Sequence, residues 1–213
     1  MVVRGLAYLA KLCEAVDNLS CGMPWVPGVS ITPLPVPGKP EHLAELVREA
    51  EGLGARKLNQ NGGAINRTFY SPAVVSGVDS RMKLYHEEQF GPVVPVALYD
   101  DIDEPVNYII ESPYGQQASI FGTDSGEIAR LIDPLVNQLC RVNINSQCQR
   151  GPDVFPFTGR QDSAEGTFSV SDALRVFSIR TLVAAKDMEI NKRLLTEILR
   201  ERKSNFLSTD YLF

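Results

Sequence analysis

Extended and helical segments alternate regularly through the middle of the chain. Residues 92–101, 118–123 and 141–147 each have the pattern of a short extended run, and the stretches between them, 102–113 and 125–140, have the pattern of a helix. Strands that alternate with helices of this length form crossover units around a mostly parallel sheet. The middle run is apolar without a clean alternation, which predicts a strand buried on both faces. We therefore expect an α/β fold, with a mostly parallel sheet and helices on both of its faces.

Two amphipathic helices are expected before this alternation. Residues 1–22 carry apolar side chains at helical spacing, and the face that they form needs a partner: Leu6, Leu9, Ala10, Cys13 and Val16. Residues 41–54 show the same spacing and place a glycine just past the expected helix end: Leu43, Leu46, Val47 and Ala50, followed by Gly54. Repeated prolines and glycines in residues 22–40 forbid a continuous helix or a central strand, so this segment is expected to be a surface loop.

Shorter elements complete the chain. Residues 55–63 predict a short strand that enters an Asn-Gly turn, and residues 69–78 an extended run broken by Pro72. Residues 168–178 open with Ser169 and Asp172 at the spacing of a capping box and predict a helix. A final extended run at 179–186 precedes a charged helix over 186–204, whose apolar stripe is formed by Leu194, Leu195, Ile198 and Leu199. This stripe is short and the polar face carries both signs, which favours a docked helix over a membrane anchor.

Composition excludes several classes of function. The chain has 213 residues and a formal net charge of -5, which is ordinary for one globular domain with a small appendage. No cluster of Lys and Arg outnumbers the carboxylates, which argues against a general role on nucleic acid or on a membrane surface. The four cysteines have neither metal-ligand spacing nor the density of a secreted scaffold, so we expect a reducing, cytoplasmic compartment and no zinc site: Cys13, Cys21, Cys140 and Cys148.

One stretch stands out as a candidate binding site. Gln147, Cys148 and Arg150 follow the expected strand at 141–147, and ligands of open α/β sheets bind beyond the carboxyl ends of strands. The bidentate fork of an arginine suits a phosphate or a carboxylate. The same spacing also allows Arg150 to pair with Asp153 or Asp162, and the sequence pattern leaves both alternatives open.

Two ordered motifs resemble the aldehyde dehydrogenase superfamily. Residues 85–96, YHEEQFGPVVPV, resemble its Glu-x-Phe-Gly-Pro signature, and residues 142–163, VNINSQCQRGPDVFPFTGRQDS, resemble the later segment that closes its substrate pocket. Within the superfamily, the run from Arg150 to Phe157 looks most like NADP-dependent, non-phosphorylating glyceraldehyde-3-phosphate dehydrogenases. The resemblance implies the fold of the catalytic domain, truncated at its N-terminal side, over residues 1–186, with an added helical tail over 187–213.

The resemblance also implies roles for particular residues. Glu88 matches the glutamate that accepts hydrogen bonds from the nicotinamide ribose, and Phe90 the aromatic residue beside the nicotinamide ring. Arg150 matches the arginine that binds the substrate phosphate, while Gln147, Cys148 and Phe157 would line the pocket. Without the motif, Glu88 would be read as a solvated acid and Phe90 as a core phenylalanine. Core packing is an equal alternative for Phe157.

The superfamily's nucleophilic cysteine, its general-base glutamate and its oxyanion asparagine align upstream of Met1, together with most of the nucleotide-binding domain. We therefore expect a portion of an NADP- or NAD-dependent enzyme that oxidises glyceraldehyde 3-phosphate or a related aldehyde. Alone, this chain is expected to be inactive and to bind the cofactor weakly. Cys148 aligns with the pocket wall, so it is not expected to replace the nucleophile.

Other interpretations stay open at this point. The chain could be a non-catalytic interaction module that kept the fold, or a separate polypeptide could supply the nucleotide-binding half. The run at 179–186 resembles the intersubunit strand of the superfamily, so we expect homo-oligomers that extend a sheet between subunits.

Overall fold

A computed structural model describes residues 2–3, 7–151, 155, 157–166, 174, 176–177, 179, 181 and 183–204. These residues belong to two compact units. The first unit comprises Met1–Gln149 and Thr158–Gly166, and the second comprises Arg150–Phe157 and Thr167–Phe213. The division expected from the sequence, between residues 186 and 187, stays a prediction.

A four-stranded sheet forms the centre of the first unit, with the order β1-β6-β5-β2. These strands are β1 (Val2–Val3), β6 (Val93–Leu98), β5 (Ala73–Ser76) and β2 (Arg56–Lys57). β6 runs parallel to both β1 and β5, and β2 joins β5 in the antiparallel direction. The expectation of a mostly parallel sheet is confirmed.

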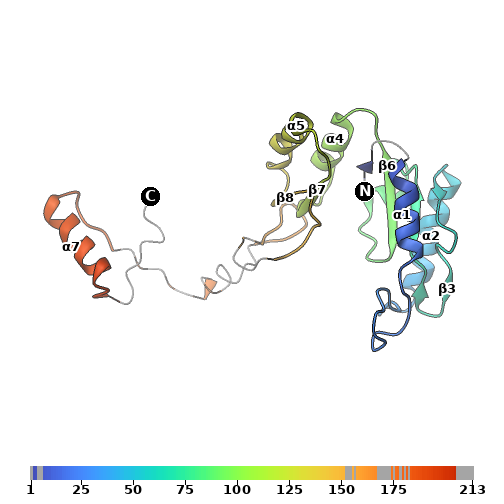
Figure 1. Cartoon of the computed structure of the whole chain (residues 1–213), viewed down its shortest axis with the longest axis horizontal. Helices are drawn as coiled ribbons and strands as arrows, with labels where there is room; N and C mark the ends of the chain where they lie inside the picture. The colour runs from blue at the N-terminus through green and yellow to red at the C-terminus, as the bar shows by residue number, and fades with distance from the viewer. Residues whose placement is uncertain are drawn as a thin grey trace. The chain divides into compact units, whose positions relative to one another are not determined.

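Helices α1 (Ala7–Asp17) and α2 (Lys39–Gly52) cover opposite faces of this sheet (Figure 1). Leu9 of α1 packs with Val74 and Val96, whereas the apolar face of α2 packs in one cluster with Val75 and Val93. Successive residues of a strand point to opposite faces, so neighbours such as Val74 and Val75 meet different helices. The four apolar residues expected on the inner face of α2 are buried, and Gly54 has the left-handed φ of 111° that suits a residue past a helix end: Leu43, Leu46, Val47 and Ala50.

A parallel pair of strands, β7 (Gln117–Ile120) and β8 (Arg141–Ile144), follows β6 in the chain and is flanked by α4 (Asp103–Glu111) and α5 (Ser125–Leu135). Asp124 caps α5 by accepting a hydrogen bond from the backbone N–H of Glu127 at 2.8 Å. The alternation of strands and helices read from the sequence is therefore confirmed. The predicted burial of the middle strand on both faces is wrong, because all four residues of β7 are only half-buried. Within the described part of the chain, β7 pairs with β8 alone, and a strand at an edge keeps part of its surface in water.

The start of the chain differs from the expected helix. Val2–Val3 form β1 and pair with Ala97 and Leu98, and the helix begins only at Ala7. Ala10, expected on the inner face, is exposed, and Leu12 packs inward with Cys13 and Val16 instead. Two adjacent β-branched residues favour a strand when a partner strand is available, and the pairing with β6 supplies that partner.

Other elements also deviate from the predicted bounds. α5 ends at Leu135 rather than at 140, one residue after Pro134, which lacks the N–H that a helix interior needs. The hairpin β3 (Ile65–Asn66) and β4 (Phe69–Tyr70), which turns at Arg67 with a φ of 55°, was not expected. Residues 22–40 lie in a loop as expected up to the start of α2 at Lys39, and 69–78 are extended on both sides of Pro72.

The second unit contains α7 (Glu189–Arg200), which confirms the helix expected over 186–204. Within the expected strand at 179–186, the described residues 179, 181 and 183–186 form no strand. A strand is defined by its hydrogen-bonded neighbour, so this run needs a partner to become one. The capping pair Ser169 and Asp172 lies outside the described residues.

Candidate functional site

A six-residue loop, 87–92, connects α3 (Lys83–His86) to β6 and carries the residues predicted for the cofactor. The backbone N–H of Glu87 donates to the carbonyl of Lys83 at 2.8 Å and closes α3. The side chain of Gln89 donates to the carbonyl of Val93 at 2.9 Å, which ties the middle of the loop to the first residue of β6. Glu88, between these two anchors, is exposed. The loop therefore presents a carboxylate to solvent from a fixed backbone.

Phe90 has an unusual position in this loop. Its ring is 76% exposed and its φ is 42°. An apolar side chain gains free energy by burial, and a bulky residue with a left-handed backbone is strained, so both features are unfavourable in the free chain. The alternative that Phe90 is a core phenylalanine is wrong. Its predicted place beside a nicotinamide ring stays a prediction.

The loop 87–92 approaches helix α2 closely at Gly91. A Cβ atom at Gly91 would lie 2.5 Å from Cδ1 of Leu43, which is fully buried on α2. Real Cβ atoms essentially never come so close to a carbon atom, and a packed core offers little room for Leu43 to move. A glycine is therefore needed where the loop crosses α2.

Two residues predicted to line the substrate pocket, Gln147 and Cys148, lie just past the carboxyl end of β8. Asn143, which is 5% exposed, is central to this region. Its Oδ1 accepts from Nε of Arg141 at 2.8 Å, and its Nδ2 donates to the carbonyl of Ala118 at 3.2 Å and to Sγ of Cys148 at 3.8 Å. The Sγ atom of Cys148 also shares a hydrogen bond with Oγ of Ser119 at 3.3 Å. Cys148 is thus held against both strands.

A second set of bonds fixes the rest of this loop. Nη1 of Arg141 donates to the carbonyl of Gln149 at 3.0 Å, and the backbone N–H of Gln149 donates to Oε1 of Gln117 at 3.2 Å. The side chain of Gln147 is exposed and donates to Oε1 of Gln149 at 3.3 Å. The pocket-lining loop is therefore tied to β7 and β8 through side chains that the sequence prediction did not single out. Arg141 and Asn143 stand two residues apart in a strand, and that spacing indicates a polar face.

In the second unit, Arg150 and Phe157 lie together. The Cζ atom of the guanidinium group of Arg150 lies over the ring of Phe157, 5.4 Å from its centroid. This distance is typical of a cation–π interaction. Phe157 is half-buried and Arg150 exposed. Asp153 lies outside the described residues, so its ion pair with Arg150 stays an open alternative.

Within the described part of the chain, no histidine bonds to Cys148. Nε2 of His42 donates to Glu87, and Nε2 of His86 donates to the carbonyl of Ser80 at 2.8 Å. Both histidines, the only two of the chain, lie within the described residues, and neither bonds to Cys148. A thiol becomes a nucleophile when a base or a positive charge favours its thiolate, and these contacts supply neither. Burial and the nearby Asp17 raise the pKa of the Cys13 thiol, which disfavours its thiolate.

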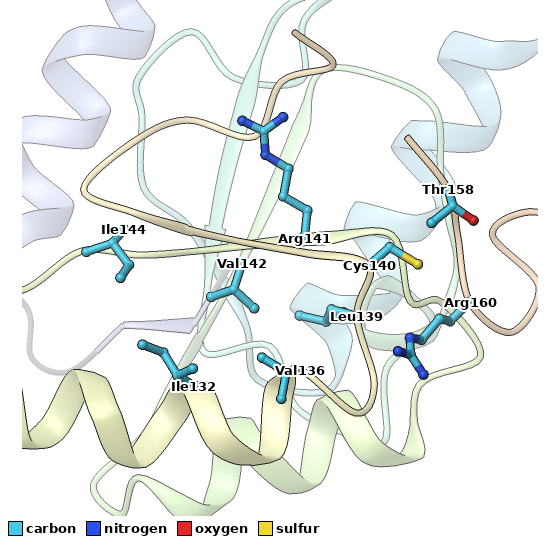
Figure 2. Close-up of a pocket in the computed structure, with 9 residues that line it drawn as sticks. All are labelled: Ile132, Val136, Leu139, Cys140, Arg141, Val142, Ile144, Thr158 and Arg160. Atoms are coloured by element: carbon cyan, nitrogen blue, oxygen red, sulfur yellow. The ribbon is translucent and has the colours of Figure 1, made fainter. Parts of the chain in front are cut away.

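A hollow of about 420 Å³ lies elsewhere in the first unit, against the other face of β8 (Figure 2). Figure 2 shows Val142 pointing toward Ile132 of α5 and toward Val136, the residue that follows α5, while Arg141 extends to the opposite side of the strand. The lining is mostly apolar: Ile132, Val136, Leu139, Cys140, Arg141, Val142, Ile144, Thr158 and Arg160. It contains none of the predicted site residues, and few polar groups converge there, so we do not assign it as the site.

The structure therefore groups the predicted residues in three places. Glu88 and Phe90 share the loop before β6, Gln147 and Cys148 share the loop after β8, and Arg150 lies over the ring of Phe157. Among the described residues, no group of three His, Cys, Asp or Glu side chains could hold a metal ion. In the same part of the chain, no helix has the length and apolar character needed to cross a bilayer.

Comparison with known proteins identifies the family. Residues 4–183 match the model of the aldehyde dehydrogenase family. The chain is 31% identical over 179 residues to an NADP-dependent glyceraldehyde-3-phosphate dehydrogenase of Streptococcus equinus, a match that covers 83% of this chain and 35% of that protein. It is 28% identical to a vanillin dehydrogenase of Pseudomonas fluorescens, over 81% of this chain and 35% of the relative. The chain belongs to the aldehyde dehydrogenase family and spans about a third of the length of these relatives.

Solved structures agree with this assignment. A crystal structure of the NADP-dependent glyceraldehyde-3-phosphate dehydrogenase from Bacillus halodurans, complexed with NADP, is 30% identical and matches with a TM-score of 0.74 over 81% of this chain and 36% of that chain. A glyceraldehyde-3-phosphate dehydrogenase from Methanocaldococcus jannaschii is 23% identical, with a TM-score of 0.77 over 87% of this chain and 40% of that one, and shows the same fold. The expected family and fold class are confirmed.

Proposed function

We propose that this chain supplies the part of an NADP-dependent aldehyde dehydrogenase that contacts the nicotinamide ribose and closes the substrate pocket, with glyceraldehyde 3-phosphate as the aldehyde. Relatives with this activity in their names support the proposal. Other relatives are named for other aldehydes, among them methylmalonate semialdehyde and 3-sulfolactaldehyde. The choice of a phosphorylated aldehyde therefore depends on Arg150.

The position of the Arg150 guanidinium over the ring of Phe157 is the observation that carries the proposal. A guanidinium that lies over an aromatic ring keeps its N–H groups at the edge of its plane, where they can donate two parallel hydrogen bonds to phosphate oxygens. Such a pair of charged hydrogen bonds contributes about 1.5–3 kcal/mol. The aromatic ring also restricts the rotamers of Arg150, so less entropy is lost when the anion binds.

The loop at 87–92 fits the cofactor. The exposed carboxylate of Glu88 can accept hydrogen bonds from ribose hydroxyl groups, and the exposed ring of Phe90 offers a flat apolar surface to the nicotinamide. NADP, when bound, accepts the hydride that the aldehyde loses. In this proposal, Glu88 and Phe90 orient the nicotinamide and exclude water from one of its faces, and Gln147 and Cys148 line the wall of the pocket.

The chain tested alone is expected to show no turnover. The resemblance assigns the thiol nucleophile and the general base to segments other than these 213 residues, and Cys148 has neither histidine as a partner. Alone, this chain is expected only to bind the substrate and the cofactor weakly. The first test is therefore a binding experiment, in which NMR spectra of the isotopically labelled chain follow its titration with 3-phosphoglycerate and, separately, with NADP.

Arg150→Ala is expected to weaken the binding of 3-phosphoglycerate by about 10-fold or more, since it removes a charged pair of hydrogen bonds. Arg56→Ala, which removes an exposed cation from β2, is the matched control and should leave binding unchanged. Equal losses of affinity in both variants would mean that anion binding depends only on the net charge of the chain, and the phosphate assignment would fail. NADP-dependent turnover of the unaltered chain that disappears in Arg150→Ala would contradict the absence of a nucleophile.

A second candidate function is a non-catalytic module for assembly. Ile179 is 98% exposed and Val183 61% exposed, and both lie in the run expected to pair between subunits. Apolar side chains this exposed favour an interaction partner. Oligomers that form while 3-phosphoglycerate and NADP leave the spectra unchanged would favour this function over the dehydrogenase.

A further inference from the structure

Helix α2 contacts the loop 87–92 through a polar side chain as well as an apolar one. Nε2 of His42 donates to Oε1 of Glu87 at 2.6 Å, which joins residues 45 positions apart in the chain. The two side chains keep 40% and 38% of their surface in solvent. Glu87 directly precedes Glu88, so this bond acts on the backbone that presents the predicted ribose ligand.

The neighbouring residue of α2 supports the other end of the same loop. Leu43 is fully buried, and its Cδ1 atom lies only 2.5 Å from the position that a Cβ atom of Gly91 would take. His42 and Leu43 are consecutive, so one turn of α2 contacts the loop both at Glu87, before Glu88 and Phe90, and at Gly91, after them. Two contacts that bracket a short segment restrict its φ and ψ angles far more than one does.

The loop needs this restriction because its middle is strained. Phe90 adopts a φ of 42° with its ring 76% exposed, an arrangement that the ring does not stabilise by burial. Strained backbone persists where the surroundings over-determine it, and such strain is concentrated at ligand sites. The hydrogen bond from Gln89 to Val93 lies within the segment, and the contacts from α2 lie at its ends.

We propose that His42 is a positioning residue: through its hydrogen bond to Glu87, it holds the loop 87–92 in the conformation that presents Glu88 and Phe90 to the cofactor. This inference deepens the proposed function and depends on it for the identity of the ligand. The positioning itself is a property of the free chain. Without the bond, the loop would sample other conformations, and the cofactor would have to select the competent one from among them.

Backbone amide hydrogen exchange of the free chain tests the positioning directly. His42→Ala is expected to speed the exchange of the amides of Glu87 and Val93, which donate to the carbonyls of Lys83 and Gly91, about two- to fivefold, the range typical of losing one solvent-exposed polar contact. His42→Gln, which keeps a donor near the position of Nε2, is expected to restore most of the protection. Amides of the core strand β5 should exchange at unchanged rates in both variants, which shows that the chain remains folded.

A double-mutant cycle separates the bond from other effects of the histidine. Glu87→Ala should speed the exchange of the same amides, and adding His42→Ala to it should have little further effect, because both changes remove one interaction. The control is His86→Ala, which removes the other histidine together with its bond to Ser80. Unchanged loop exchange in His42→Ala, or additive effects in the double variant, would overturn the proposal.

NADP titrations distinguish this proposal from the proposed function. If the amides of Glu88–Gly91 respond to NADP in the unaltered chain, His42→Ala should lower the affinity by the same two- to fivefold factor, and His42→Gln should recover it. If NADP leaves these amides unchanged while His42→Ala still accelerates the exchange of the Glu87 and Val93 amides, the cofactor assignment fails and the positioning by His42 stands. An affinity lowered equally by His42→Ala and His86→Ala would contradict a specific role for His42.

Discussion

At Phe90, the conformation that suits the proposed binding of the cofactor lowers the stability of the chain. The left-handed backbone of Phe90 suits a glycine, and its ring lies in solvent. Phe90→Gly is therefore expected to leave the free energy of unfolding unchanged or to raise it by up to about 1 kcal/mol, while the response to NADP is lost. Urea unfolding and the NADP titration measure the two effects. A marked loss of stability would show that the ring packs against the chain.

The burial of Tyr70 makes the stability of the chain depend on pH. Only 1% of its surface is exposed, and burial together with the nearby Glu51 raises its pKa to about 12. Its ordinary value is about 10 in an unfolded chain, so its contribution to stability is complete below about pH 10 and is lost as the pH rises toward 12.

Tyr70→Phe has no proton to lose at this position. We therefore expect the stability of the unaltered chain to fall more steeply between about pH 10 and 12 than that of Tyr70→Phe. Urea unfolding at several pH values measures this difference. Parallel pH dependences in the two chains would mean that Tyr70 ionises as easily when folded as when unfolded.

At the scale of an element, β8 uses its two faces differently. Val142 and Ile144 contribute to the apolar hollow beside α5, whereas Asn143 and Arg141, which also borders the hollow, hold the loop that carries Cys148. Asn143→Ala would leave the carbonyl of Ala118 and the guanidinium of Arg141 with fewer partners. The expected cost is about 1–3 kcal/mol of stability.

The same substitution is expected to make Cys148 more accessible. Sγ of Cys148 would lose one of its two hydrogen-bonding neighbours, so alkylation of this thiol should become faster. Mass spectrometry of single cysteines after iodoacetamide treatment measures the rate. Asn137→Ala, which removes a side chain that bonds only to the helical carbonyl of Asp133, should change neither the stability by more than about 0.5 kcal/mol nor the rate. An unaltered rate in Asn143→Ala would show that other contacts hold the loop.

For the whole molecule, we propose self-association through residues 179–186. The described residues of this run form no strand, and Ile179 and Val183 are exposed. A second copy could supply the partner that a strand needs and cover these side chains. Sedimentation velocity should show a species larger than the monomer, and Val183→Asp should shift the distribution toward the monomer. A compact monomer alone, at working concentrations of the unaltered chain, is the result that would rule this out.

Local sequence patterns determined much of this fold. The apolar spacing on α2, the alternation from β6 to β8 and the charged helix α7 all follow from periods of 3.6 or 2 residues, which depend on backbone geometry alone. The loop after β8 was identified because ligands gather at the carboxyl ends of strands. The loop at 87–92 precedes β6, and only the resemblance of its motif to a known family indicated it.

Tertiary structure decided the rest, because it depends on partners that are distant in the chain. Val2–Val3 become a strand only where β6 is available, and β7 stays half-buried because a single described strand flanks it. The bond between His42 and Glu87 spans 45 residues. Without the motif, Phe90 would be read as a core phenylalanine, yet the contact of Gly91 with Leu43 places the loop on the surface of α2 and leaves the ring in solvent. Periodicity describes which face of an element is apolar, whereas packing between elements decides what that face meets.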